Sequence, residues 1–342
     1  MILNYKKILL GVSILSVVQS GLGNIIYILP PCGYHNEKLF DIDDPYFNRN
    51  NGILHFYTLR EELRKKGYDL KTTLLYDNYL PQFAGLIACD LPADKERLDR
   101  LASLPKNKLS LLLFEPPTVV RHYYDRELHK LFGKVFIMLD DWVDSKHYFK
   151  LYFPQPSLQM VEQTVPFKDK KLCTLIAGNK TSNYPFELYS ERKKVLHFFE
   201  PYQSDFDFYG SGWSYNDYSC YKGAPDSKLD VLKKYKFCIC YENTCNIMGY
   251  VTEKIFDCLL AGCVPVYWGA CNIADFVPQE CFIAQDRFKS LPELYEFLKN
   301  MTQETHDQYV QAMKAFFNSK KAHLFSQDYF VRSMMHQLLG NV

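Results

Sequence analysis

The sequence predicts an α/β protein with two Rossmann-like domains that face a central cleft. The chain has 342 residues, which corresponds to about two domains of ordinary size. From Asn24 onward, short apolar runs alternate with amphipathic stretches, as is typical of βα units around a parallel sheet. This alternation is interrupted near the middle of the chain by a stretch rich in proline and charge. We therefore expect one parallel sheet on each side of the interruption.

The composition excludes a disordered chain and a protein that binds nucleic acid through its overall charge. Hydrophobic residues make up 47% of the sequence and charged residues 23%, so the chain can bury enough apolar surface to fold. The 40 Lys and Arg residues almost balance the 39 Asp and Glu residues, and no run of five like charges occurs. Any bound anion must therefore be held by a few well-placed side chains.

Residues 24–155 are expected to form the first Rossmann-like domain. Its predicted strands are Ile25–Leu29, Leu86–Cys89 and Leu109–Phe114. One predicted helix buries Leu59 and Leu63, and a second buries Leu98, Leu101 and Leu104. Prolines follow the first and last of these strands, where they end the sheet ladder because proline lacks the backbone N–H.

Residues 156–171 are expected to form a linker, and residues 172–342 a second domain with terminal helices. The stretch YFPQPSLQMVEQTVPFKDKK around the linker contains three prolines and ends in charged residues. The predicted elements of the second domain are strands Leu172–Ala177, Phe206–Tyr209, Tyr235–Tyr241 and Cys263–Trp268, and helices Glu191–Phe199 and Val251–Ala261. Ligands of such sheets bind outside the carboxyl ends of the strands, so the site is expected in the cleft.

Residues 1–23 carry the pattern of a signal peptide or a short membrane anchor. Lys6 and Lys7 precede an apolar stretch of 11 residues, and small residues follow it. Eleven residues are too few to span a bilayer without interruption. A buried first helix or strand is the alternative interpretation. We expect membrane association through this segment.

The cysteines are predicted to be buried core thiols. Seven of the eleven lie between Cys238 and Cys281, but no C-x-x-C pair occurs and the spacing matches no zinc site. Their neighbours are mostly apolar, as expected for thiols that behave as small hydrophobic groups. The odd number argues against a full disulfide framework.

The stretch Tyr241–Gly269 contains the strongest candidate for a binding site. A strand ends in a polar loop that leads through Gly249 into a helix whose first turn holds Thr252, Glu253 and Lys254. A phosphate group there would meet free backbone N–H groups, the positive end of the helix dipole and a lysine ammonium. The alternative is an ordinary helix start, with Thr252 as the N-cap and a solvated lysine.

This stretch closely resembles the donor-binding signature of the inverting α-1,3-fucosyltransferases, glycosyltransferase family ten. The segments Tyr241-Glu242-Asn243, Tyr250–Lys254 and Pro265–Gly269 match its F/Y-E-N, Y-[IV]-T-E-K and P-V-x-x-G motifs in order. The resemblance is strong from about Leu172 to Phe288 and loose in the first half of the chain. The loop of five residues between Asn243 and Gly249 is a departure in length.

The resemblance implies a GT-B fold and GDP-L-fucose as the donor, with no required cofactor and no metal. It implies that Lys254 and Arg192 bind the pyrophosphate, that Glu253 and Tyr250 hold ribose, base or fucose, and that Asn243 lines the same pocket. For Arg192, a solvated helix face is the alternative.

Glu115 is the candidate catalytic base. Transfer with inversion needs one carboxylate, which takes the proton from the acceptor hydroxyl as it attacks. Glu115 follows a predicted strand at its carboxyl end, and Pro116-Pro117 fixes the turn that presents it. The alternative is a solvated carboxylate at a strand end. The resemblance implies an acceptor hydroxyl on an oligosaccharide or glycoconjugate, with O3 of N-acetylglucosamine favoured, although the residues themselves leave the acceptor open.

The segment MLDDWVD is similar to the D-x-D metal motif of another glycosyltransferase class. Its carboxylates, Asp140, Asp141 and Asp144, could ligate Mg²⁺ or Mn²⁺. We favour helix capping by Asp140 or Asp141, because Lys254 and Arg192 already supply charge for the leaving group.

Two other functions stay open from sequence: a GT-B transferase that uses another nucleotide-sugar, and a non-catalytic glycan-binding protein on this fold. The compartment also stays open. A Golgi-type lumen is expected in a eukaryote, and the cytoplasmic face of the membrane in a bacterium.

Overall fold

The computed structural model describes residues 22–75, 82–89 and 91–340. The expected signal peptide or anchor therefore lies outside the described residues, apart from its last two positions. Among the helices described, none has the length and hydrophobicity that a membrane span requires.

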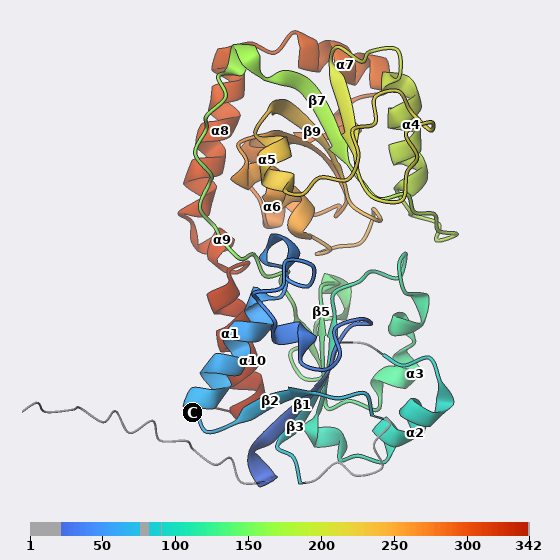
Figure 1. Cartoon of the computed structure of the whole chain (residues 1–342), viewed down its shortest axis with the longest axis vertical. Helices are drawn as coiled ribbons and strands as arrows, with labels where there is room; N and C mark the ends of the chain where they lie inside the picture. The colour runs from blue at the N-terminus through green and yellow to red at the C-terminus, as the bar shows by residue number, and fades with distance from the viewer. Residues whose placement is uncertain (1–21, 76–81, 90, 341–342) are drawn as a thin grey trace, which may run out of the picture.

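The first domain is built on a parallel sheet in the order β2-β1-β3-β4-β5-β6, counted within the described residues (Figure 1). Its strands are β1 (Ile25–Leu29), β2 (Asp69–Thr72), β3 (Gly85–Ala88), β4 (Leu109–Leu113), β5 (Lys134–Ile137) and β6 (Tyr148–Lys150). Its helices are α1 (Leu54–Lys65), α2 (Lys95–Ala102) and α3 (Arg126–His129). Every residue of β4 is buried, which explains why four of its five residues are leucine; the fifth is Ser110.

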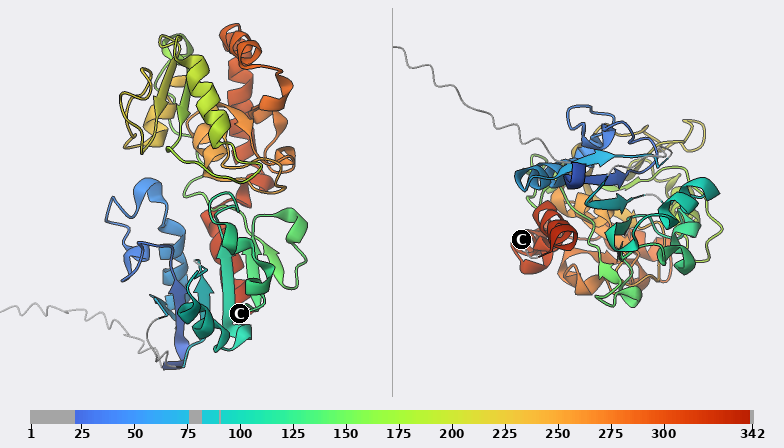
Figure 2. Two further views of the ribbon diagram at one scale, coloured as in Figure 1. Left: turned by 90° about the vertical axis from the view of Figure 1, so that its right-hand side faces the viewer. Right: turned by 90° about the horizontal axis from the view of Figure 1, so that it is seen from below.

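The second domain is built on a parallel sheet in the order β11-β10-β9-β7-β8, again within the described residues. Its strands are β7 (Lys171–Ile176), β8 (Phe206–Tyr209), β9 (Tyr235–Tyr241), β10 (Val264–Trp268) and β11 (Ile283–Ala284). Its helices are α4 (Tyr189–Phe199), α5 (Lys228–Leu232), α6 (Glu253–Leu260), α7 (Leu291–Lys299), α8 (Gln303–Phe317) and α9 (Lys320–His323). The two domains form separate lobes along the long axis (Figure 2), which confirms the predicted fold class.

Residues 151–166 connect the two sheets with no helix or strand of their own. The backbone N–H of Gln155 donates to Phe325, and that of Val161 donates to Leu260. The connecting segment is thus held along the second domain by backbone hydrogen bonds.

The last helix, α10 (Gln327–Leu339), returns to the first domain and packs beside α1 (Figure 1). Phe330, Val331 and Met334 belong to the same core cluster as Phe56 of α1. This differs from the predicted boundaries, which place everything up to residue 342 in the second domain. The local pattern of an amphipathic helix does not reveal which of two sheets it will cover.

The buried cysteines agree with the prediction of core thiols. Nine of the eleven are buried, and the exceptions are Cys32 and Cys271. Several of the buried thiols lie in the core of the second domain, on β9, on α6 and directly before β10.

Candidate active site

A cavity of about 410 Å³ lies where the two domains meet. Residues that follow β4, β7, β8 and β9 line it, so the carboxyl ends of strands from both sheets open into one space. In the second sheet this is the position where the strand order reverses, between β7 and β9, and such a reversal opens a crevice for a ligand. All six predicted site residues line this cavity: Glu115, Arg192, Asn243, Tyr250, Glu253 and Lys254.

The described lining of this cavity carries an excess of positive charge. It includes five cationic side chains and two carboxylates: Arg49, Lys180, Arg192, Lys228 and Lys254 against Glu115 and Glu253. Because the chain as a whole has a net charge of only +1, this excess is a local feature of the site. A cavity with this charge balance suits an anionic ligand such as a pyrophosphate.

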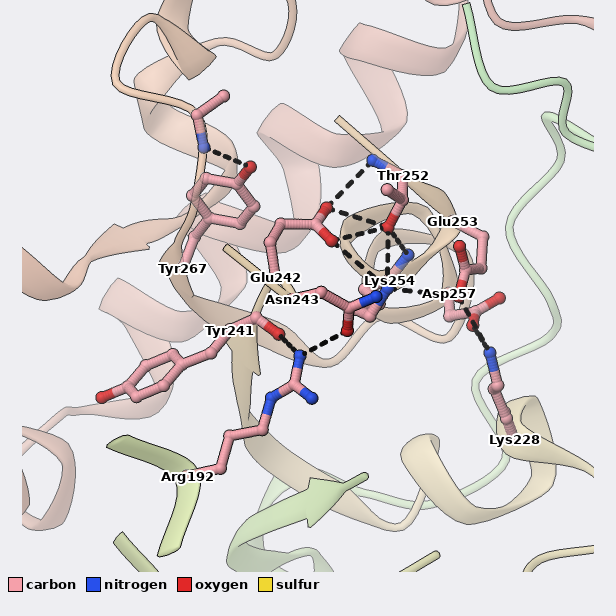
Figure 3. Close-up of polar contacts among 11 residues, drawn as sticks. Arg192, Lys228, Tyr241, Glu242, Asn243, Thr252, Glu253, Lys254, Asp257 and Tyr267 are labelled. Carbon is pink, nitrogen blue, oxygen red and sulfur yellow. Dashed lines mark hydrogen bonds and ion pairs between the residues drawn. The ribbon is translucent and has the colours of Figure 1, made fainter. Parts of the chain in front are cut away.

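The start of α6 is organised by the buried carboxylate of Glu242 (Figure 3). Thr252 is the N-cap, and its backbone N–H donates to Glu242 Oε1 at 2.9 Å. The Thr252 hydroxyl donates to Glu242 Oε2 at 2.7 Å. Glu242 therefore fixes the first turn of the helix, which carries Glu253 and Lys254 into the cavity.

Lys254 lies between three acceptors. Its Nζ is 3.3 Å from Glu242 Oε2, 3.5 Å from Glu253 Oε1 and 3.1 Å from Thr252 Oγ1. Burial would lower the pKa of Lys254, but Glu253 and Glu242 outweigh that effect and raise it. Lys254 is therefore a permanent cation at the floor of the cavity.

Glu253 is held by a second lysine that comes from α5. Lys228 Nζ lies 3.6 Å from Glu253 Oε1 and 2.8 Å from Asp257 Oδ2. Burial alone would raise the pKa of Glu253, but Lys254 and Lys228 lower it to about 2. Glu253 is thus ionised at neutral pH and can only accept hydrogen bonds, which suits contact with sugar hydroxyls.

Arg192 reaches the cavity from the inner face of α4, so its guanidinium is buried (Figure 3). Its Nη2 donates to the carbonyl of Tyr241 at 2.6 Å and to Asn243 Oδ1 at 3.1 Å. These contacts exclude the alternative of a solvated helix face. They also bring Asn243 and Arg192 together at the end of β9.

Tyr250 connects the second domain to the first. Its side chain is 1% exposed and belongs to the core cluster of the first domain, although the residue follows β9 in the chain. The preceding Gly249 has a φ of +79°, and a Cβ at this position would collide with Asp140 and Lys150. Glycine is therefore required where the loop crosses between the domains.

Glu115 is presented from the first domain, directly after β4 and Phe114. Its side chain is open to the cleft, and its backbone carbonyl accepts a hydrogen bond from Tyr124 Oη at 2.9 Å. Desolvation by the surrounding protein raises the pKa of the Glu115 carboxyl, although the positive charges of Lys254 and Lys180 partly lower it. A carboxylate with a raised pKa is a stronger base once it is ionised.

The carboxylates of the three aspartates in MLDDWVD do not converge on one site. Asp140 Oδ1 is 2.6 Å from Lys150 Nζ, whereas Asp144 Oδ1 accepts three backbone N–H groups from residues 146–148. Neither Asp140 nor Asp141 caps a helix with its side chain, so the favoured capping role is wrong. Within the described residues, no group of three or more His, Cys, Asp or Glu side chains is arranged to hold a metal ion.

Four residues that shape the site were not proposed as site residues from sequence. Glu242 belongs to the recognised motif, and its position beside Asn243 could have suggested a role. Lys228 and Arg49 each begin a short helix, and Lys180 lies in a loop. No local pattern distinguishes these three residues from surface cations.

Comparison with known proteins places the second domain in a family. The family described as Glycosyltransferase family 10 (fucosyltransferase) C-term matches residues 165–336, just over half of the chain. An α-(1,4)-fucosyltransferase of Arabidopsis thaliana is 43% identical over 70 residues, which are 20% of this chain and 17% of that protein. The α-(1,3)-fucosyltransferase FucT of Helicobacter pylori is 40% identical over 74 residues, which are 21% of this chain and 15% of that protein.

A longer match joins this chain to a mouse protein, 4-galactosyl-N-acetylglucosaminide 3-alpha-L-fucosyltransferase 9. The two are 25% identical over 159 residues, which are 46% of this chain and 39% of the mouse protein. The matched segments thus span less than half the length of these curated relatives.

The whole chain resembles solved glycosyltransferase structures. A crystal structure of an α1,3-fucosyltransferase aligns with a TM-score of 0.56 at 14% identity, and the alignment covers 93% of this chain and 90% of that one. A DNA-modifying β-glucosyltransferase also aligns with a TM-score of 0.56, at 10% identity, covering 92% of this chain and 99% of that one. At such identities the likeness shows the fold, which is of the GT-B type. The fold and the family match together show that the chain belongs to glycosyltransferase family 10, the fucosyltransferases.

Proposed function

We propose that this protein is an inverting fucosyltransferase, which moves L-fucose from GDP-β-L-fucose to a hydroxyl of a glycan acceptor. One observation carries the proposal: the six predicted residues, drawn from both domains, line the same cavity. The cations come mostly from the second domain and the candidate base comes from the first, as a displacement between a bound donor and an incoming acceptor requires.

The donor is proposed to bind at the start of α6. Lys254 and Arg192 would contact the pyrophosphate, with the guanidinium able to grip two oxygens. Glu253, which Lys254 and Lys228 keep ionised, would accept hydrogen bonds from ribose or fucose hydroxyls. Asn243 would line the same pocket. Tyr250 also lines the cavity, but its side chain is 1% exposed and packs in the core of the first domain, so it would support the pocket wall and not hold the sugar. The positive end of the α6 helix dipole would attract the phosphate in addition to the charge of Lys254.

The chemistry is a single displacement. The acceptor oxygen forms a bond to the anomeric carbon of fucose while the bond from that carbon to the phosphate oxygen breaks. The proton of the acceptor hydroxyl passes to Glu115, and GDP leaves with its new charge stabilised by Lys254 and Arg192. The configuration of the anomeric carbon inverts, from the β-linked donor to an α-linked product.

The expected acceptor position is O3 of N-acetylglucosamine. Relatives named as α-(1,3)-fucosyltransferase and as 4-galactosyl-N-acetylglucosaminide 3-alpha-L-fucosyltransferase support it. One relative is named as an α-(1,4)-fucosyltransferase, so the test must read the linkage as well as the sugar.

The decisive experiment incubates the purified chain with GDP-fucose and an array of acceptors that contain N-acetylglucosamine or glucose. The product linkage is read by NMR, and parallel reactions contain GDP-mannose or UDP-sugars. The proposal expects an α-fucosyl product from GDP-fucose alone. Transfer from another nucleotide-sugar would make the protein a different GT-B transferase, and glycan binding without release of GDP would make it a non-catalytic lectin.

Membrane association through residues 1–23 stays a separate proposal. Its test is fractionation of cells that express the full chain and a form beginning at residue 24. The proposal expects the full chain in the membrane fraction and the shorter form outside it, and equal distribution of the two forms would overturn it.

A further inference from the structure

The two lysines at the start of α6 are surrounded by carboxylates (Figure 3). Lys254 Nζ lies 3.3 Å from Glu242 Oε2 and 3.5 Å from Glu253 Oε1. Lys228 Nζ lies 3.6 Å from Glu253 Oε1 and 2.8 Å from Asp257 Oδ2. Three carboxylates therefore face two ammonium groups, and this cluster has no excess of positive charge. The excess that an anion requires comes from other side chains of the cavity.

Three cations of the described lining are not neutralised in this way: Arg49, Lys180 and Arg192. Arg192 donates to two neutral acceptors at the end of β9, as described above. Neither Arg49 nor Lys180 lies within ion-pair distance of a carboxylate in the part of the chain that the structure describes. Lys180 and Arg192 belong to the second domain. Arg49 is thus the one cation that the first domain adds to the described lining of the cavity.

Arg49 begins a short helical turn in the loop between β1 and α1. The side-chain amide of Asn48 donates to the carbonyl of Ile42 at 2.8 Å, which folds the loop on itself. Asn50 and Asn51 follow with left-handed backbones, at φ values of 54° and 58°. Asparagine adopts this conformation more readily than most residues. The local sequence therefore allows the chain to turn sharply directly after Arg49.

Arg49 reaches across the cleft to the second domain. Its Nη2 donates to the carbonyl of Pro225 at 2.5 Å. Pro225 lines the same cavity, and it lies three residues before Lys228, which contacts Glu253. A guanidinium has five N–H donors in a planar fork, so the contact with Pro225 leaves donors for a ligand. Arg49 can therefore contact the second domain and a bound anion at the same time.

We propose that Arg49 is a donor-binding residue of the first domain, which contacts the diphosphate of the nucleotide-sugar while it holds Pro225. This inference rests on the proposed function and deepens it. The cavity has its full positive charge only when the two domains lie together, because Arg49 comes from the opposite domain to Lys180 and Arg192. A bound diphosphate in turn ties the first domain to the second.

The test compares the binding of GDP, inorganic pyrophosphate and guanosine, by calorimetry for the first two and by NMR titration for guanosine. Arg49→Ala should raise the dissociation constant of GDP about tenfold or more, because a charge-assisted contact to phosphate is lost. The dissociation constant of pyrophosphate should rise as well. That of guanosine, which has no phosphate, should stay within about twofold of the parent.

Two further variants complete the test. Arg49→Lys keeps the charge but not the planar fork, so it should weaken binding of GDP less than Arg49→Ala does. Arg332→Ala removes an exposed arginine of α10 that lies outside this cavity. It is the matched control and should change none of the three dissociation constants.

The outcomes separate this inference from the proposed function. If the parent binds GDP and Arg49→Ala binds it within about twofold as tightly, Arg49 does not contact the donor, and the proposed function stands. If Arg49→Ala weakens guanosine as much as GDP, Arg49 acts only through the contact between the domains, and the inference is wrong. If the parent binds pyrophosphate but neither GDP nor GDP-fucose, the proposed function is overturned, and the pyrophosphate measurements still decide the role of Arg49. If the parent binds none of these ligands, both are overturned.

Discussion

Asn272 of the second domain donates a hydrogen bond from Nδ2 to Asp140 Oδ2 of the first domain, at 2.9 Å. The same asparagine accepts the backbone N–H of Gly249 at 2.8 Å. Lys150 completes the contact, since its Nζ donates to Asp140 Oδ1 at 2.6 Å and to the carbonyl of Gly249 at 3.2 Å. These groups enclose the loop next to Tyr250. They therefore tie the loop before Tyr250 to the first domain, which is the domain that carries Glu115.

Asn272→Ala is expected to lower kcat about tenfold to a hundredfold, because a small misplacement of reacting groups is costly. The dissociation constant of GDP-fucose should stay within about threefold of the parent, since the donor contacts lie elsewhere. Kinetics and calorimetry measure the two quantities. Asn300→Ala, at the exposed end of α7, serves as the control. An unchanged kcat in Asn272→Ala would show that this contact does not position the site.

Lys254→Met should weaken binding of GDP-fucose by at least about tenfold, because a charge-assisted contact to phosphate contributes about 1.5–3 kcal/mol. Methionine keeps the aliphatic stem, so the packing around α6 is disturbed less than by alanine. Calorimetry measures the affinity, and Lys194→Met on the exposed face of α4 is the control. Unchanged donor affinity would remove Lys254 from the pyrophosphate site.

Glu242→Gln should lower the free energy of unfolding by about 1.5–3 kcal/mol, because charged hydrogen bonds at a fully buried position are replaced by neutral ones. Urea denaturation followed by circular dichroism measures the change. Glu280→Gln, at an exposed position, should have almost no effect. Equal stability of the two variants would mean that Glu242 does not organise the start of α6.

Activity should survive EDTA at a substantial level. Asp140 is engaged with Lys150 and Asn272, and Asp144 holds a turn, so neither carboxylate is available for a shared ion. The measurement is the rate of GDP release before and after chelation. If chelation abolished GDP release and Mn²⁺ restored it, the prediction would be wrong and these aspartates would become candidate metal ligands.

Much of the fold and part of the site could be predicted from local sequence. β1, β8 and β9 have the bounds that the sequence predicts. β1 is apolar throughout, as a buried parallel strand is, whereas β8 and β9 are mostly apolar and each include one charged residue, Asp207 and Lys236. The cluster at the start of α6 was predictable, since an N-cap, an acid and a lysine are adjacent in the sequence.

Contacts between the domains could not be predicted in the same way. The return of α10 to the first domain, the pairing of Asp140 with Asn272 and the approach of Arg49 to the cavity all depend on how two lobes meet. A surface cation and a cation that lines a site have the same local pattern. Only the arrangement of the sheets distinguishes them.

The raised pKa of Glu115 has a consequence for the pH profile. The base acts in its ionised form, so kcat/KM should fall as the pH drops through a value above the ordinary 4.5. For stability the sign is opposite: a raised pKa favours folding at low pH, and this contribution is lost as the pH rises through the folded-state pKa. Glu115→Gln should therefore fold at neutral pH at least as stably as the parent.

The turnover of Glu115→Gln tests the central claim most directly. Glutamine keeps the size of the side chain and an acceptor oxygen but cannot take the proton. We expect kcat for fucosyl transfer from GDP-fucose to fall about 10²–10⁴-fold, with the dissociation constant of GDP-fucose nearly unchanged and the acid limb of the pH profile lost. A kcat within about threefold of the parent would contradict the account, because the proton would then have to leave through another group.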